Sequence, residues 1–180
     1  MAGNILSKIL LEGNWSNKSI QIGDVLSDGS HVFYVDGTGQ HGLSCNPYVV
    51  NPGGGFNVIW GCSTNTTGAN ADGVGMGLNN MNIVRGLCGT GTFQQYAFNI
   101  SASAISDGYY LPSKTELSLL VSNLIVPKIY NPANYVSTFS STFWSSTEVD
   151  GPNAWAVDTL GNVAKMPKTT GFAIVIVKKF

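Results

Sequence analysis

The sequence predicts one domain of the α+β class, in which strands near both ends of the chain enclose a helical middle. Apolar residues make up 43% of the 180 positions, which is enough to form a genuine core. The first and last thirds hold stretches rich in β-branched and aromatic residues, separated by Gly-containing turns. The middle holds two stretches with apolar residues at helical spacing, and one of them carries a helix-start motif.

Residues 1–19 are expected to form an arm or a short helix ahead of the main domain, which spans 20–180. The arm contains one short apolar run, which Ser7 and Lys8 interrupt. It has no basic start and no cleavage site, so no signal peptide is recognised. The protein therefore stays inside the cell, leaves by a route such as lysis, or has had its signal removed. No membrane insertion is expected, because no stretch approaches the roughly eighteen continuous apolar residues of a span.

A small β-meander is predicted over residues 20–45. Apolar residues precede a turn at Asp28-Gly29, where glycine supplies the positive φ that a tight hairpin requires. The stretch HVFYVD follows this turn, and a second turn over 36–40 leads into HGLSC. Two short strands are therefore expected on either side of the second turn.

Residues 51–71 are expected to form a loop, with Trp60 packed against the core as its anchor. The chain has three cysteines, so at most one internal disulfide can form. A bond between Cys62 and Cys88 would contribute about 3 kcal/mol of stability. Three reduced, buried thiols are an equally acceptable alternative. No two cysteines have the C-x-x-C spacing of zinc ligands, so no zinc site is expected.

Two helices are predicted in the middle of the chain. Over 77–89, apolar side chains recur at helical spacing, and Gly89 marks the end. These side chains are Leu78, Met81, Val84 and Leu87. The second helix begins with a capping box of Ser113 and Glu116, in which each side chain satisfies a free backbone N–H, and it ends before Pro127. Its apolar stripe comprises Leu117, Leu120, Val121 and Leu124.

The last third of the chain is predicted to be β-structure. The expected strands cover 141–147, 153–159, 162–167 and 171–180. Gly161-Asn162 is expected to form the hairpin turn between the second and third of them. The last strand is apolar on both faces and is expected to lie centrally in a sheet. Trp144 and Trp155 are expected to pack in the core, with a stacking platform for a sugar as the alternative.

Several motifs appear along the chain in a characteristic order. They are GDVLSDGSHVFYVDGTGQHGL, WGC, GYYLPSKTELSLL, FWSSTE and AWAV, followed by an apolar closing strand and a terminal aromatic residue. In this order they resemble the DUF1566 family, also called the Lcl C-terminal domain family, over roughly residues 20–180. The closing strand departs from the family pattern, because it reads VIVKKF where the family tends to have VR-x-V.

The resemblance implies a C-type-lectin-like fold, in the variant seen in formylglycine-generating enzymes, with small twisted antiparallel sheets flanked by two helices. It also implies binding rather than catalysis, since relatives include trimeric surface adhesins and phage tail proteins. We therefore expect a non-enzymatic domain that recognises a glycan or a host surface receptor. It would be displayed on a virion or a cell surface as a homo-oligomer, with a trimer favoured. The alternative is a structural virion or fibre protein whose domain serves assembly with other virion proteins.

The expected ligand face consists of the loops and strand faces around 149–171. Its polar residues combine hydrogen-bonding groups and charges of both signs, as glycan sites do. These residues are Asp150, Asn153, Asp158, Asn162, Lys165 and Lys168. Lys165 and Lys168 could engage an acidic sugar, and the alternative is that both are solvated lysines on an edge strand. Glu148, in the WSS-x-E motif, is expected to make a structural hydrogen bond.

No cofactor is expected, although oxygen ligands between Glu148 and Asp158 leave Ca²⁺ open as an alternative. Their order differs from the EPN and WND motifs of C-type lectins. An enzyme is not expected, because no serine has a base beside it and both histidines lie in the first meander. The cysteines all lie in the first half, unlike the late pair of formylglycine-generating enzymes. Charged residues are only 11% with a net charge of −1, so no nucleic-acid partner is expected.

Overall fold

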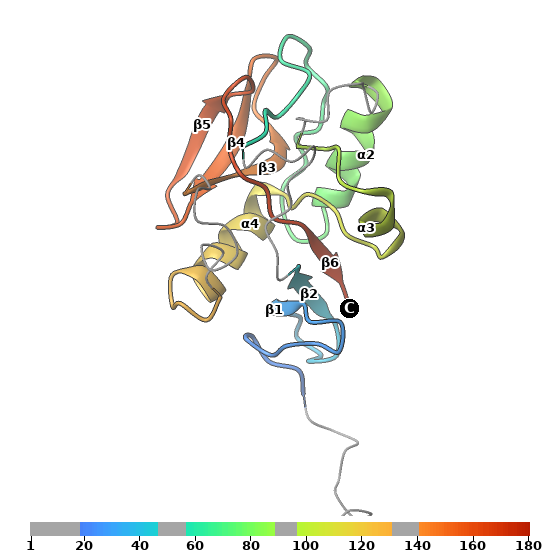
Figure 1. Cartoon of the computed structure of the whole chain (residues 1–180), viewed down its shortest axis with the longest axis vertical. Helices are drawn as coiled ribbons and strands as arrows, with labels where there is room; N and C mark the ends of the chain where they lie inside the picture. Colours follow the sequence, from blue (N-terminus) through green and yellow to red (C-terminus); the bar gives the residue numbers. More distant parts are fainter. Residues whose placement is uncertain (1–18, 47–56, 89–96, 131–140) are drawn as a thin grey trace, which may run out of the picture.

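The computed structural model describes residues 19–46, 57–88, 97–130 and 141–180. The expectation of an arm therefore falls almost entirely outside the described residues, as does the first part of the 51–71 loop. The described residues combine helices with two small antiparallel sheets of three strands each, as Figure 1 shows. This content agrees with the predicted α+β class.

The first sheet has the order β1-β2-β6, with β1 at His31–Val35, β2 at Gly42–Cys45 and β6 at Val177–Lys179. The Asp28-Gly29 turn precedes β1, and Gly29 has a φ of +83°, as predicted. The stretch expected to form a strand before this turn is reduced to a single bridge between Val25 and His31. The second predicted turn joins β1 to β2, and this part of the meander prediction is confirmed.

The second sheet has the order β3-β4-β5. Its strands are Thr142–Glu148, Asn153–Asp158 and Val163–Pro167. The predicted hairpin turn lies between β4 and β5, where Gly161 has a φ of +89°. Strand β3 leaves the regular ladder with β4 between Trp144 and Glu148. Within this irregular stretch Ser146 donates its backbone N–H to the Pro112 carbonyl at 2.7 Å. The start of α4 is thereby tied to the sheet.

Helix α4, Lys114–Leu120, begins with the predicted capping box. Ser113 Oγ accepts from the Glu116 N–H at 3.2 Å, and Glu116 Oε2 accepts from the Ser113 N–H at 2.7 Å. The helix continues as a wider π-helical turn, η2, over Val121–Ile125 and ends before Pro127. All four residues of the predicted apolar stripe are fully buried. This helix was predicted correctly because its signals lie within a few residues of one another.

Helix α2, Gly77–Cys88, matches its predicted range, but its buried face differs from the predicted stripe. Met81 and Val84 are buried, whereas Leu78 and Leu87 are 39% and 66% exposed. Asn80 is buried instead and donates its side-chain amide to the Ala71 carbonyl at 2.7 Å. A third helix, α3 at Ala102–Ser106, was not predicted, so the expected pair of helices is incomplete.

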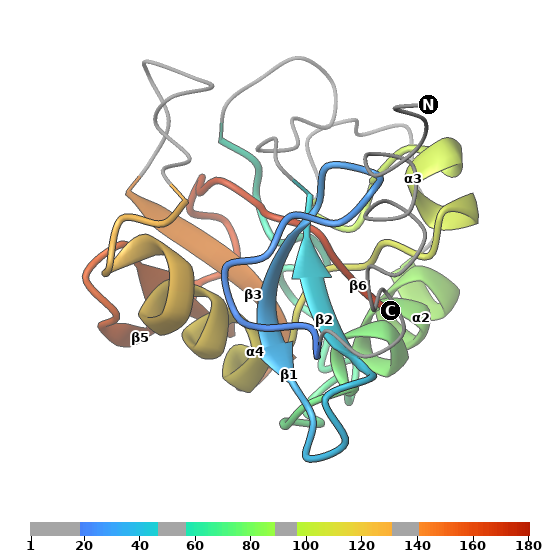
Figure 2. The same ribbon diagram turned by 90° about the horizontal axis from the view of Figure 1, so that it is seen from below.

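The closing segment passes between the two sheets, as the path from β5 to β6 in Figures 1 and 2 shows. Phe172 bridges Val58 and Ala173 bridges Phe143, before Val177 joins the first sheet beside β2. Residues 173–177 are all buried, which confirms that both faces of this segment are covered. A single central strand is the wrong description, because the hydrogen-bond partners change along the segment.

Candidate functional site

The strand register decides how the two tryptophans of the last third are placed. Trp144 pairs with Ala156 and is fully buried, with its indole N–H donating to the Val58 carbonyl at 2.9 Å. Trp155 lies on the opposite face of β4 from the buried Ala154 and Ala156, and it is only partly buried. The prediction of a core position is therefore confirmed for Trp144 and wrong for Trp155.

Lys114, the first residue of α4, lies beside the Trp155 ring. Its ammonium nitrogen is 5.1 Å from the ring centroid, within the range of a cation–π contact. The Lys114 backbone N–H donates to Thr147 Oγ1 at 2.9 Å, which fixes the helix start against β3. Its ammonium group also pairs with Asp72 Oδ2 at 2.8 Å. The ammonium group that lies over the indole ring is thus itself part of an ion pair.

Lys165, on β5, lies beside Trp155, on β4. The two residues are direct cross-strand partners, so their side chains lie on the same face of the sheet. Lys165 Nζ pairs with Asp150 Oδ2 at 2.7 Å, and both side chains remain substantially exposed to solvent. Asp150 Oδ1 accepts from the backbone N–H and the side-chain amide of Asn153, at 2.9 and 2.7 Å. The hydrogen bonds from Lys165 and Asn153 hold the pKa of Asp150 below its usual value.

These groups together form what we call the Trp155 surface: Trp155, Lys114, Asp72, Lys165 and Asp150. It presents one aromatic ring with the Lys114 ammonium over it and Lys165 as its cross-strand neighbour, and each lysine is paired with its own carboxylate. The four charges sum to zero. The surface therefore offers an apolar ring and hydrogen-bonding groups without a net charge.

Asp158 and Asn162 lie at the other end of β4 and do not contribute to this surface. Asp158 Oδ1 accepts from the backbone N–H groups of Leu160 and Asn162, each at 2.9 Å. Asp158 Oδ2 accepts from the Asn162 side-chain amide at 2.8 Å. These bonds close the hairpin turn. About 17 Å of strand separates Asn153 from Asp158, so the predicted ligand face does not converge into one site.

Lys168 is the clearest correction to the predicted ligand face. Its side chain is fully buried, so it is neither a solvated edge lysine nor a group that can reach a ligand. Its ammonium nitrogen lies 2.6 Å from Glu148 Oε1, 3.1 Å from the Asn65 carbonyl oxygen and 4.5 Å from the centre of the Trp60 ring. The chain turns inward after β5, where the Lys168 N–H donates to the Pro152 carbonyl at 2.8 Å.

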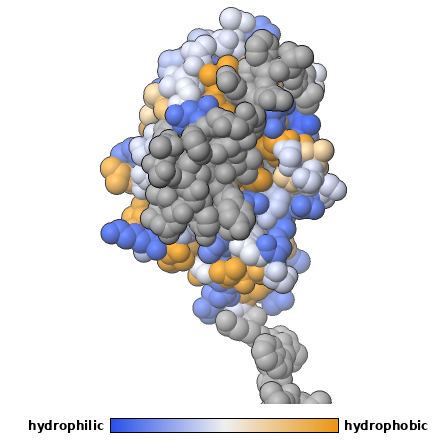
Figure 3. Space-filling view, viewed as in Figure 1, coloured by the Kyte–Doolittle hydropathy of each residue, from blue (hydrophilic) through white to orange (hydrophobic). Residues whose placement is uncertain are grey.

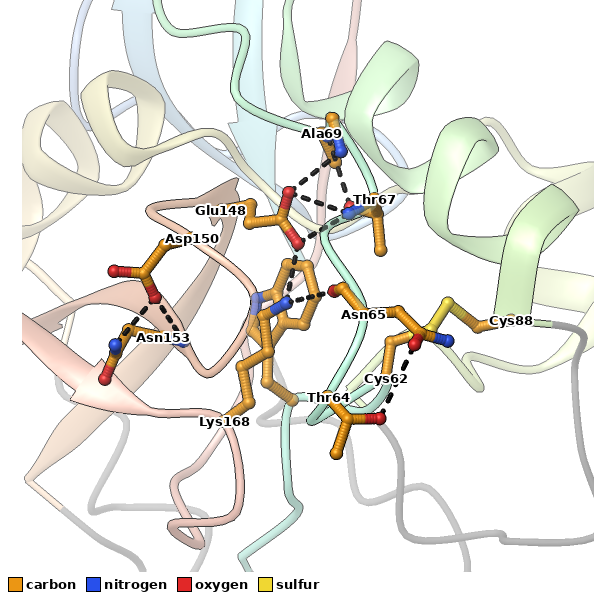
Figure 4. A network of polar contacts seen from close by, with 12 residues as sticks. Cys62, Thr64, Asn65, Thr67, Ala69, Cys88, Glu148, Asp150, Asn153 and Lys168 are labelled. Atoms are coloured by element: carbon orange, nitrogen blue, oxygen red, sulfur yellow. Dashed lines mark hydrogen bonds and ion pairs between the residues drawn. A yellow bond between two sulfur atoms is a disulfide. The ribbon is translucent and has the colours of Figure 1, made fainter.

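Glu148 is the centre of the buried network drawn in Figure 4. Besides Lys168, its carboxylate accepts from the backbone N–H groups of Thr67 at 2.9 Å and Gly68 at 2.8 Å. Burial raises the pKa of Glu148, but Lys168 and these two N–H groups outweigh it and hold the pKa below its usual value. The structural role expected for Glu148 is confirmed.

A disulfide between Cys62 and Cys88 links the segment that precedes Thr67 and Gly68 to the end of α2, with the two Cα atoms 5.9 Å apart. The structure therefore decides against three reduced thiols. Trp60, the predicted anchor, is fully buried and donates its indole N–H to the Ser145 carbonyl at 2.8 Å. Cys45 remains a free thiol in the core, where burial raises its pKa to about 12.

Lys114, Asp72 and the exposure of Trp155 were missed by sequence reasoning. One signal was present, since alternation along NAWAVD puts Trp155 on the same face as Asn153, which was expected to be exposed. Nothing in the sequence pattern indicated that Lys114 or Asp72, which lie far from β4 along the chain, would border the ring.

Within the described ranges, no three His, Cys, Asp or Glu residues gather as a metal site would require. The helices of those same ranges include none with the length and apolar character of a membrane span. Comparison with protein-family models and with curated protein sequences finds no match to this chain.

Proposed function

We propose that this chain is a non-enzymatic binding module that recognises a glycan, or a receptor that carries one, through the Trp155 surface. The observation that carries the proposal is the partly buried Trp155, with ion-paired Lys114 over its ring and ion-paired Lys165 as its cross-strand partner. An indole can stack on the C–H face of a sugar ring, while neighbouring carboxylates and ammonium groups bond to hydroxyls. The order of the DUF1566-like motifs supports the same reading, and the two small antiparallel sheets are compatible with the fold that this resemblance implies.

The charges favour a neutral glycan over a sulfated or otherwise acidic one. Lys114 and Lys165 are already paired with Asp72 and Asp150, so an anionic ligand would have to displace a carboxylate from each lysine. Lys168, the other lysine expected to attract an acidic sugar, lies buried on Glu148. We further propose that binding needs no calcium, because the carboxylates of Asp150 and Asp158 already accept hydrogen bonds from their own loops.

A glycan array with neutral, sulfated and sialylated members tests the proposal, run with calcium and with a chelator. We expect binding to neutral members in both conditions, and at least about a tenfold loss for Trp155→Ala. Leu160→Ala is the matched control, since Leu160 is 78% exposed at the far end of the same hairpin. Absence of binding at saturating concentrations, or equal binding by Trp155→Ala, would overturn the proposal. Binding restricted to the sulfated and sialylated members would contradict the proposal that the ligand is a neutral glycan.

Assembly is the second candidate function, and a group of exposed apolar side chains favours it. Ile22, Val25, Val126 and Ile129 are between 46% and 59% exposed. The Gly23 backbone lies against Ile129, because a Cβ on Gly23 would be 3.5 Å from Ile129 Cγ2. In the view of Figure 3, apolar side chains gather at the lower end of the molecule, over the part that contains β1 and β2.

We propose that a second copy of the chain covers these apolar side chains, with a trimer on a virion or cell surface as the favoured assembly. Sedimentation of the whole chain tests this. Wild type is expected to sediment as an oligomer and Ile129→Asp as a smaller species. Leu160→Asp, which also places a charge on an exposed leucine, is the control. A monomeric wild type at high concentration would rule out the assembly function while leaving the glycan proposal intact.

A further inference from the structure

A polar groove lies away from the Trp155 surface, where the first sheet meets α3. One cavity of about 400 Å³ is lined by Asp28, Asn46, Asp107, Tyr109 and Lys178. An adjoining cavity of about 240 Å³ shares Asn46, Asp107 and Tyr109 with it. The second cavity adds Ser101, Ser103, Ala104 and Ile176. The two cavities form one groove with the size of a small-molecule site. Figure 2 shows the elements that supply it, β6 and α3.

The charged groups on one side of this groove are held in place by buried partners. Asp28 Oδ1 accepts from the Ser30 N–H at 3.1 Å and from the Ser30 hydroxyl at 2.7 Å. Ser30 in turn bonds to Ser44 at 3.0 Å, and both serines are fully buried. Lys178 pairs with Asp28 and lies 4.8 Å from the centre of the Tyr109 ring. Most surface ion pairs contribute little stability, but in this one Asp28 bonds to the buried Ser30. These bonds fix the geometry of the groove wall.

The lining from the α3 segment carries a carboxylate and two hydroxyls, and the Ser101 hydroxyl also accepts from the Ala104 N–H at 3.2 Å as the cap of α3. Asp107 follows α3 and lines both cavities, and no residue in the described parts of the chain donates a hydrogen bond to its carboxylate. The hydroxyls of Ser101 and Ser103 lie 3.0 Å apart at the exposed start of α3. A carboxylate accepts hydrogen bonds and hydroxyls both donate and accept them. A ligand that matches this side must supply several hydroxyl donors.

We propose that this groove is a second binding site and that it takes a neutral saccharide unit. The charge balance separates this class from others. Lys178 is already paired, and the groove contains the two carboxylates of Asp28 and Asp107, so an anion is disfavoured. Apolar contact is limited to Tyr109, Ala104 and Ile176, which is too little for a hydrophobic ligand. In this proposal the hydroxyls of the sugar bond to Asp107, Ser101 and Ser103, which line the same cavity.

Saturation-transfer NMR and calorimetry on the whole chain test this site, with methyl glycosides of glucose, galactose, mannose and N-acetylglucosamine as probes. We expect at least one probe to bind saturably, and Asp107→Ala to weaken it by about tenfold or more. The same titrations are run in the Trp155→Ala chain, which removes the other proposed sugar site, and Leu160→Ala is the control that should leave probe binding unchanged. Asp107 is exposed, so its variant should fold, and the melting temperature checks this.

The outcomes distinguish the two sites. Loss of the binding that remains in the Trp155→Ala chain when Asp107→Ala is added supports the groove, whatever the glycan array gives for Trp155. Equal binding by the Trp155→Ala chain with and without Asp107→Ala, or no saturable binding of any probe to that chain, would overturn it. A groove that binds spermidine and none of the glycosides would also overturn it, because that result assigns the carboxylates to a cationic ligand.

Discussion

Lys168 Nζ lies 2.6 Å from Glu148 Oε1, and both side chains are at most 2% exposed. This pair joins the end of β3 to the segment after β5, and it holds the backbone at Thr67 and Gly68 against the second sheet. Removing one partner of a buried ion pair strongly destabilises a protein, because the remaining charge has neither a partner nor solvent around it. Two residues expected on sequence grounds to have different roles thus form one structural unit.

Breaking this pair should destabilise the protein strongly. Lys168→Met is expected to lower the free energy of unfolding by about 3–5 kcal/mol, since it leaves Glu148 buried without its cation. Glu148→Gln in the same chain should recover part of the loss, because the amide oxygen still accepts from Thr67 and Gly68. Lys165→Met, at the exposed ion pair, should change the value by less than about 1 kcal/mol. Urea denaturation measures all three, and equal effects of the two lysine variants would contradict the buried role.

Stability should fall in acid, and Glu148 should account for part of the fall. The pKa of Glu148 is held below its ordinary value of 4.5, so its contribution is present above that value and is lost as the pH falls through and below it. The pKa of Asp28 is also lowered, as burial is outweighed by Lys178 and Ser30. Denaturation at about pH 7 and about pH 3 should show a smaller decrease for Glu148→Gln than for wild type. An identical pH dependence would show that Glu148 does not contribute.

Removing the disulfide should cost stability without removing the fold. Cys62 and Cys88 are 26 residues apart, and a loop of this size corresponds to about 3 kcal/mol. Cys62→Ser with Cys88→Ser should therefore lower the free energy of unfolding by about that amount and abolish its response to dithiothreitol. Cys45→Ser is the control, because Cys45 is a free thiol and its variant should keep the response. A wild type that is insensitive to the reductant would contradict the bond.

Two glycines of α2 should respond to alanine in opposite directions. A Cβ at Gly77 would lie 2.5 Å from Glu116 Oε2 and 2.6 Å from the Leu111 carbonyl oxygen, so Gly77→Ala must displace packed groups. A loss of about 1–3 kcal/mol is expected. At Gly86 no atom lies within 4 Å of the added Cβ. Gly86→Ala should therefore stabilise the protein by about 0.5–1 kcal/mol through helix propensity. Thermal denaturation measures both, and a stabilised Gly77→Ala would contradict the close approach.

The local elements of this fold were predictable, because each is fixed by residues near one another in the chain. The capping box of Ser113 and Glu116 is one example, and the turn at Gly161-Asn162 is another. The predictions were wrong where contacts between residues far apart in the sequence determine which side chains are buried. Leu78 and Leu87 fit a helical stripe but are exposed, because the face of α2 that packs in the core carries Gly77, Asn80, Met81 and Val84.

The candidate site divides in the same way. The sequence by itself determined that polar residues cluster on the β4–β5 hairpin, and that Asp150 and Asn153 lie together at its start. Only the tertiary structure decided that Lys165 is exposed while Lys168, three positions later, is buried on Glu148. It also decided that Trp155 is partly exposed beside Lys114 while Trp144 is in the core. The physical reason is that burial depends on strand register and on partners from distant segments, which residue type and spacing do not specify.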